Sequence, residues 1–237
     1  MSLLKSIFPQ VLFREKSPIY GTVEVVQAGS ERQLLVNGVR QSVDKNASNI
    51  GQRYWSRVVD IAYEYQGKRL EKFLILGLGG GTVAHFICKK FPNSRIDGVE
   101  LDPVVLEVGE RFFGLAEVPG LHIVQGDAFD VVDNPDRYEL SFSSYDLIFV
   151  DVFQGGNFPD KFKKIEFFEK TKKLLSSGGL VVYNQTTRSS VDKSLKSFEK
   201  GVSKVFVPIK KQEVGASLGF SNFLFFCTHF SRGSSCG

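Results

Sequence analysis

Cysteine is scarce in this chain of 237 residues. Its three cysteines are odd in number and show no CxxC spacing, which argues against a disulfide framework and against a zinc site. The three histidines are scattered along the chain, so the sequence predicts no bound metal. Unpaired cysteines are typical of a reducing compartment, and we therefore expect a cytoplasmic protein.

A large excess of one charge and long apolar runs are also lacking. The formal net charge of +4 is too small to require a nucleic-acid partner. No stretch approaches the ~20 apolar residues of a membrane span, and the apolar part of "MSLLKSIFPQV" is too short for a signal peptide. The composition therefore disfavours nucleic-acid and membrane partners.

Tight-turn residues mark the beginning of the chain. In residues 17–43, "AGS" and "NG" follow β-rich runs at 22–26 and 33–36. This pattern predicts a small antiparallel β unit of two to four strands, which we assign to residues 1–48. At the other end "SRGSSCG", residues 231–237, is expected to be a flexible tail.

Between these ends, residues 49–230, apolar runs alternate with helix-like segments. This alternation predicts an α/β domain with a doubly wound, mostly parallel seven-stranded sheet. The last two strands have only a loop between them and should pair antiparallel. We expect strands at 73–77, 95–100, 121–124, 145–151, 179–184, 203–209 and 222–228, and helices near 53–65 and at 82–91, 103–112, 160–175 and 190–201.

The first strand of this domain leads into "LILGLGGGTVAHF", residues 74–86, with four glycines in five positions. No glycine-lysine pair follows, so the stretch is not a P-loop. Thr82 stands where a G-x-G-x-x-G fingerprint has its third glycine, which weakens a nicotinamide-dependent oxidoreductase as an interpretation without excluding it. The spacing Gly77-x-Gly79-x-Gly81 suits a nucleoside whose amino-acid portion lies against the turn.

Acidic residues follow three further strands, at the sheet edge where ligands of such folds bind. Glu100 can accept hydrogen bonds from both ribose hydroxyls, whereas Asp102 is better placed to cap the next helix. Asp127 can accept from an adenine amine, although a helix cap is an equally open role. Asp151 ends the apolar run "YDLIFVD" and is a candidate base or amine anchor, with a loop cap as the alternative.

Taken together, the glycine turn and the three acids resemble the class I S-adenosylmethionine-dependent transferases. Within that class, "SPIYGTVEV", "LLVNGVRQSV", "VELDPVVLEVGERFF", "GDAFDVV" and "YDLIFVD" are similar in order to spermidine synthases and related polyamine aminopropyltransferases. The resemblance covers residues 17 to about 185. It implies S-adenosylmethionine or its decarboxylated form as the donor, a small-molecule or protein amine as the acceptor, and a homodimer, because members of the family are often dimers.

The same resemblance assigns roles to individual residues. Carried over by motif, cofactor-binding roles fall on Gln41, Gly77, Gly79, Gly81, Glu100, Asp127 and Ala128, and catalytic roles on Tyr54 and Asp151. Asp151 matches the acid that activates the attacking amine, and Tyr54 matches a tyrosine of the substrate pocket.

Two departures from the family pattern bear on the group transferred. The family's GGGDGG turn has an aspartate where this chain has Gly80, and the second acid of its DSSDP motif falls at Gln154. Each missing charged hydrogen bond costs ~1.5–3 kcal/mol in holding a cationic substrate. S-adenosylmethionine brings a carboxylate as well as an amine, so its binding requires no acid at Gly80.

We therefore favour methyl transfer over aminopropyl transfer. The alternative is a spermidine synthase with an altered acceptor site, in which Glu24, Glu31 or Asp160 supplies the missing charge. A third hypothesis, of another class, is a catalytically silent module that binds a nucleoside or a protein.

Overall fold

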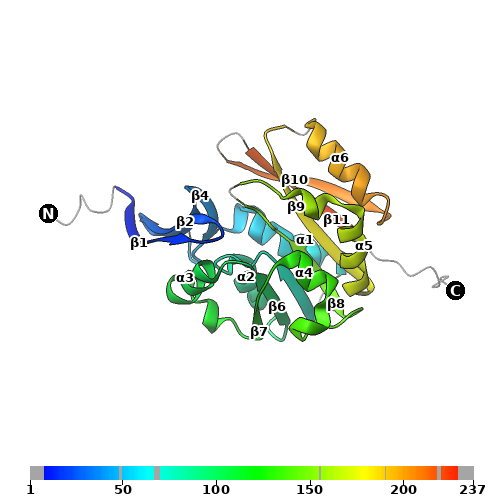
Figure 1. The fold of residues 1–237 in the computed structure, drawn as a ribbon, viewed down its shortest axis with the longest axis horizontal. Helices are drawn as coiled ribbons and strands as arrows, with labels where there is room; N and C mark the ends of the chain where they lie inside the picture. The colour runs from blue at the N-terminus through cyan, green and yellow to red at the C-terminus, as the bar shows by residue number, and fades with distance from the viewer. Residues whose placement is uncertain are drawn as a thin grey trace.

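The computed structural model describes residues 8–47, 50–66, 70–154, 156–189, 191–217 and 220–228. In this part of the chain two β-sheets lie side by side, with the smaller one at the left of Figure 1. The expected boundary at residues 48 and 49 and the expected tail at 231–237 lie outside the described residues.

The smaller sheet is an antiparallel meander in the order β1-β2-β3-β4. A tight turn joins β3 to β4, and both of its residues, Asn37 and Gly38, have positive φ angles, as "NG" predicts. This confirms the small antiparallel unit. Its strands are β1 (Gln10–Ser17), β2 (Gly21–Ala28), β3 (Glu31–Val36) and β4 (Val39–Val43).

The larger sheet has seven strands in the order β10-β11-β9-β8-β5-β6-β7. Five neighbouring strands are parallel, and β11 pairs antiparallel with both β9 and β10. The predicted doubly wound, mostly parallel sheet is therefore confirmed. The strands are β5 (Lys72–Leu76), β6 (Arg95–Glu100), β7 (Leu121–Gln125), β8 (Tyr145–Val150), β9 (Leu175–Thr187), β10 (Ile209–Ser217) and β11 (Phe220–Thr228).

Helices cover both faces of this sheet, because successive apolar residues of each strand point to opposite sides. In β5, for example, Leu74 packs into the core under α4, α5 and α6, while Phe73 and Ile75 pack into the core under α1 and α2. The helices are α1 (Tyr54–Gln66), α2 (Thr82–Lys90), α3 (Pro103–Phe113), α4 (Ala128–Asp133), α5 (Ile165–Leu174) and α6 (Lys193–Val202), with 3₁₀ turns at η2 (Ile50–Gln52), η4 (Leu115–Glu117), η5 (Pro135–Tyr138) and η6 (Asp160–Lys163).

The prediction of a strand at 203–209 was wrong. The apolar run there does not enter the sheet, because Phe206 is fully buried in the core beside Val202 at the end of α6. The strand begins only at Ile209. Since β10 lies at the edge of the sheet, its mostly polar sequence needs no continuous apolar run.

The helix predicted at 160–175 is shorter than expected. It is divided into the turn η6 and the helix α5, and Leu175 already begins β9.

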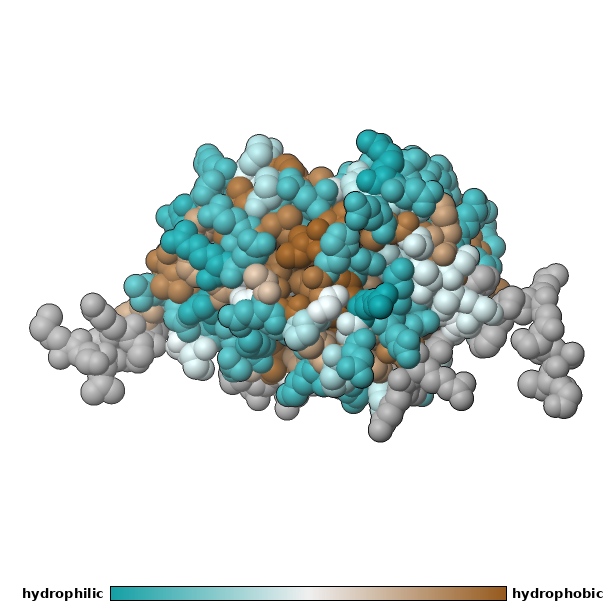
Figure 2. Space-filling view, turned by 90° about the horizontal axis from the view of Figure 1, so that it is seen from below, coloured by the Kyte–Doolittle hydropathy of each residue, from teal (hydrophilic) through white to brown (hydrophobic). Residues whose placement is uncertain are grey.

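The distribution of polar and apolar side chains on the surface is consistent with burial of the apolar residues in the cores on both sides of the sheet. Figure 2 shows that the face seen from below is mostly hydrophilic, with hydrophobic side chains gathered near its middle. Among the described residues, no helix combines the length and the apolar character needed to cross a membrane.

Specific hydrogen bonds join the small sheet to the large domain. The Thr82 hydroxyl, at the start of α2, accepts from the Val43 N–H at 3.1 Å and donates to the Val43 carbonyl at 2.9 Å. Arg32 donates to the carbonyl of Phe112 at 2.7 Å, and Ser17 donates to the Asp102 carboxylate. These contacts hold the small sheet against the carboxyl ends of the parallel strands.

Candidate active site

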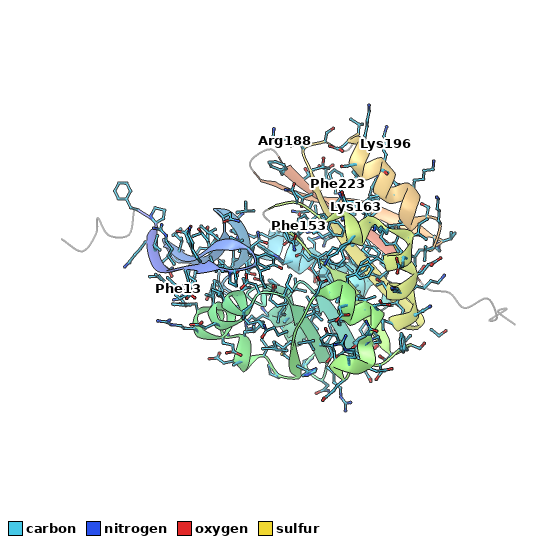
Figure 3. All side chains as sticks on the ribbon, in the orientation of Figure 1. Phe13, Phe153, Lys163, Arg188, Lys196 and Phe223 are labelled. Carbon is cyan, nitrogen blue, oxygen red and sulfur yellow. The ribbon has the colours of Figure 1, made fainter. Side chains whose placement is uncertain are left out.

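A cleft lies between the small sheet and the ends of the parallel strands of the large sheet. One wall is formed by the small sheet, and the other by the segments that follow β5, β6, β7 and β8. Phe153, labelled in Figure 3, lines it from the middle of the molecule, between the small sheet and α5. Of the residues with expected roles, Gln41, Gly77, Gly79, Glu100, Asp127, Ala128 and Asp151 line this cleft.

The glycine turn lines the cleft. At Gly77 it requires glycine for steric reasons. Gly77 has φ +94°, and a Cβ atom there would collide with the backbone carbonyl of Asp151. Its N–H and that of Leu78 both donate to the Val99 carbonyl at 2.9 Å, which ties β5 to β6. Gly81 has a different place: it is the N-cap of α2, packs against Leu115 and does not line the cleft.

Glu100, at the end of β6, is held almost entirely by backbone. Its carboxylate accepts from the N–H groups of Gly79 at 2.9 Å, Leu101 at 2.8 Å and Asp102 at 3.1 Å. Burial raises the pKa of Glu100, and these three hydrogen bonds oppose the rise. Asp102 is fully buried and caps α3 through the Val104 N–H, as the sequence indicates.

Asp127 combines the two roles that the sequence leaves open. One carboxylate oxygen caps α4 by accepting from the Phe129 N–H at 2.8 Å, while the residue also lines the cleft. Its other oxygen forms an ion pair with Lys161, which comes from η6 and was not foreseen.

Asp151, which follows β8, receives two side-chain hydrogen bonds. The Tyr54 hydroxyl donates to Oδ2 at 3.0 Å and the Asn184 amide donates to Oδ1 at 2.7 Å. Burial raises the pKa of Asp151 to about 6, although both hydrogen bonds stabilise its charged form. Tyr54 is thus beside Asp151 without lining the cleft itself, and burial next to this carboxylate raises the pKa of its phenol.

Asn184 was missed by the sequence analysis. It is 1% exposed in β9, and its Oδ1 has no hydrogen-bond partner among the described residues. The signal was available, because Asn184 ends the apolar run "LVVYN" in the same way that Asp151 ends its own. Tyr20, which lines the cleft near Glu100, was also missed.

Comparison with known proteins identifies the family of the chain. The family model for the spermine/spermidine synthase domain matches residues 52–215. The chain belongs to this family.

Relatives with two different activities are found. The chain is 37% identical over 121 residues to a polyamine aminopropyltransferase of Vibrio vulnificus, which covers 51% of this chain and 40% of that protein. It is 31% identical over 127 residues to an eEF1A lysine and N-terminal methyltransferase homolog of Drosophila melanogaster, with 52% and 18% covered. The matches thus span two fifths or less of the length of these curated relatives.

A solved structure supports the fold and the family together. A probable spermidine synthase from Corynebacterium glutamicum superposes with a TM-score of 0.75 at 25% identity, covering 96% of this chain and 82% of that one. The chain therefore combines a spermine/spermidine synthase family domain with a mixed α/β architecture.

This spermidine synthase-like site lacks the first acid that the resemblance implies. The Gly80 N–H donates to the Ser42 hydroxyl at 2.8 Å. A Cβ atom at position 80 would lie 3.0 Å from Ser42 Cβ and 3.3 Å from Phe113 Cγ. A side chain at position 80 would therefore require these neighbours to shift by a few tenths of an ångström.

The acids considered as replacements lie elsewhere. Glu24 pairs with Arg14 at 2.7 Å, Glu31 pairs with Arg53 at 2.5 Å, and Asp160 pairs with Lys163 at 2.9 Å. None of the three lines the cleft in the described part of the chain, whereas Gln154 does.

Proposed function

We propose that the chain transfers an alkyl group from an S-adenosyl sulfonium donor to the nitrogen of an amine acceptor. The observation that carries this proposal is the Asp151 carboxylate, held by Tyr54 and Asn184 in the same cleft as Glu100 and the glycine turn. A positioned carboxylate beside a nucleoside-shaped site can orient an amine and take its proton.

The donor side of the cleft fits a nucleoside that carries an amino acid. Glu100 offers a carboxylate for the ribose hydroxyls, and Asp127 offers one for the adenine amine. The first residues of α2, Thr82 and Val83, line the cleft, and no side chain caps this helix. Because the first N–H groups of a helix attract negative charge, this end of the cleft favours a donor with a carboxylate.

On the acceptor side, Asp151 supplies the charge and Asn184 helps to position it. With a pKa of about 6, Asp151 is mostly ionised at neutral pH and able to accept an N–H of the amine. Asn184 donates its amide to Oδ1 of Asp151 at 2.7 Å, while Asn184 itself is 1% exposed and does not line the cleft. The bound sulfonium makes its neighbouring carbon electrophilic, so the remaining task of these residues is to present the nitrogen lone pair in line.

We favour methyl transfer, because the crowded Gly80 leaves the donor amine without a carboxylate while α2 favours a donor that has one. Aminopropyl transfer is the second candidate, and the relatives favour it: the aminopropyltransferase is 37% identical against 31% for the methyltransferase homolog.

Calorimetry with S-adenosylmethionine and its decarboxylated form, side by side, tests the choice. We expect tighter binding of the carboxylated ligand. A preference for the decarboxylated ligand would establish the second candidate instead, and binding of neither would favour a catalytically silent module.

A further inference from the structure

A lysine lies at the end of the cleft where the base of the donor is proposed to bind. Lys161 belongs to η6 and lines the cleft, as do Asp127 and Ala128. Its ammonium group donates to Asp127 Oδ2 in an ion pair. Because Asp127 follows β7 and η6 follows β8, this ion pair joins two of the segments that line the cleft. A ligand group that reaches Asp127 Oδ2 therefore meets Lys161 as well.

Two contacts fix the position of the Lys161 side chain. Besides the ion pair, its Nζ lies 4.9 Å from the centre of the Phe162 ring, a distance at which a cation and an aromatic ring attract each other. The side chain of Lys161 nevertheless remains 37% exposed, and that of Asp127 remains 33% exposed. Both charged groups are thus held in place and still accessible to a ligand in the cleft.

The two groups keep hydrogen-bonding capacity after they pair. A carboxylate has about four lone-pair sites. Asp127 uses one oxygen to cap α4 through the Phe129 N–H and the other to accept from Lys161, so each oxygen has a lone pair left. An ammonium group carries several N–H donors, and Lys161 directs one of them to Asp127. The pair can therefore accept one further hydrogen bond and donate another at the same place.

Adenine presents the complementary pair of groups. Its 6-amino group donates hydrogen bonds, and the ring nitrogens on either side of that group, N1 and N7, accept them. A carboxylate beside an ammonium group matches this donor beside an acceptor. The match involves the base alone and does not depend on the group that the donor transfers.

We propose that Lys161 is a second residue that recognises the base of the donor: it donates to a ring nitrogen next to the 6-amino group, while Asp127 accepts from that group. This inference rests on the proposed function, because it places adenine at Asp127. A hydrogen bond from an ionised donor is stronger than one between neutral groups. A base without the ring nitrogen leaves the ammonium group unpaired, so Lys161 determines specificity at this end of the cleft.

Nucleosides that lack a single ring nitrogen test the inference. The parent ligand is 5′-methylthioadenosine, which carries the base and the ribose without the amino-acid portion, so its binding does not depend on the choice between the two donors. Its 1-deaza and 7-deaza analogues each have a C–H group in place of one ring nitrogen and keep the 6-amino group. Calorimetry would measure the binding of all three ligands to the wild type and to two variants, and mass spectrometry would measure the alkylated product from each donor.

The variants are Lys161→Met and, as a matched control, Lys163→Met. Lys163 belongs to the same turn η6, and its side chain is 35% exposed, close to the 37% of Lys161. It pairs with Asp160, and neither residue lines the cleft. The two substitutions thus remove the same charge from the same turn, inside and outside the cleft.

The wild type should bind one of the two analogues about tenfold or more weakly than the parent ligand, because that analogue lacks the nitrogen that Lys161 contacts. Lys161→Met should bind the parent ligand about tenfold more weakly than the wild type does. It should also reduce the loss for that analogue to about twofold or less, because the partner of the missing nitrogen is gone. Lys163→Met should behave as the wild type. A general loosening of the cleft would instead weaken all three ligands by the same factor.

Three outcomes would overturn the inference. Equal binding of all three ligands by the wild type, or an unchanged preference in Lys161→Met, would mean that Lys161 contacts neither ring nitrogen. Tighter binding of the parent ligand by Lys161→Met would mean that the lysine competes with the base for Asp127. Binding of none of the three ligands would remove the nucleoside from the cleft. A preference that depends on Lys161, in a protein that forms no product from either donor, would uphold the inference and overturn the proposed transfer.

Discussion

The proposed donor half and the proposed acceptor half of the cleft are built in different ways. On the donor side, backbone N–H groups hold Glu100 through three hydrogen bonds and one oxygen of Asp127, whose other oxygen pairs with Lys161. On the acceptor side, Asp151 and Asn184 are held by side chains, and Asn184 keeps an unpaired oxygen among the described residues. Hydrogen bonds from backbone N–H groups are set by the fold. Hydrogen bonds between side chains are lost or altered when one of those residues is substituted. Under the proposed function, the fold would determine the donor class, and single residues would determine the acceptor.

Replacing Asp151 should give the largest effect, because it should change turnover while leaving donor affinity almost unchanged. If Asp151 serves only the acceptor half, Asp151→Asn lowers turnover by about 10²–10⁴-fold, the usual contribution of a general base, and leaves donor affinity within about twofold. Single-turnover assays and calorimetry measure the two quantities on the same preparation. Asp160→Asn is the matched control, because Asp160 is exposed and pairs with Lys163 outside the cleft. An equal loss of donor affinity would show that the halves are not separate.

Glu100→Gln is the reciprocal test. The substitution keeps the shape of the side chain but removes the charge that is proposed to bind the ribose, so donor affinity should fall by about 10–100-fold. The relative preference among acceptors should not change, because Glu100 lies on the donor side. Calorimetry and competition between acceptors measure the two effects. Glu117→Gln, at an exposed glutamate paired with Lys45 at 3.7 Å, is the control, and a donor affinity as high as that of this control would remove Glu100 from the donor site.

The same division explains what the sequence could and could not predict. Glu100, Asp127 and Asp151 were found because residues after parallel strands gather at one edge of the sheet. Tyr20 was not found, because no rule of sequence pattern states how a separate small sheet docks on that edge. The strand β10 was misplaced for a related reason, since the burial of Phe206 depends on tertiary packing and not on local alternation.

The smallest expected effect concerns the pH dependence of folding stability. It tests whether Asp151, on the acceptor side of the cleft, is desolvated. Burial raises the pKa of Asp151 to about 6, compared with about 3.9 in an unfolded chain. Between these values the folded state binds more protons than the unfolded state, so this carboxyl stabilises the fold at low pH. The contribution is lost as the pH rises through about 6.

Asp151→Asn removes that titration, so the wild type should lose about 1–2 kcal/mol of stability relative to the variant between pH 4.5 and pH 7.5. Urea unfolding of both proteins at the two pH values measures the difference, and every other titrating group cancels in the comparison. Asp160→Asn should show almost no change between these two pH values, because Lys163 lowers the pKa of Asp160 and the carboxyl is ionised at both. Parallel curves for the wild type and Asp151→Asn would mean that water solvates Asp151 fully, in which case the acceptor half would lack the desolvated base on which its chemistry depends.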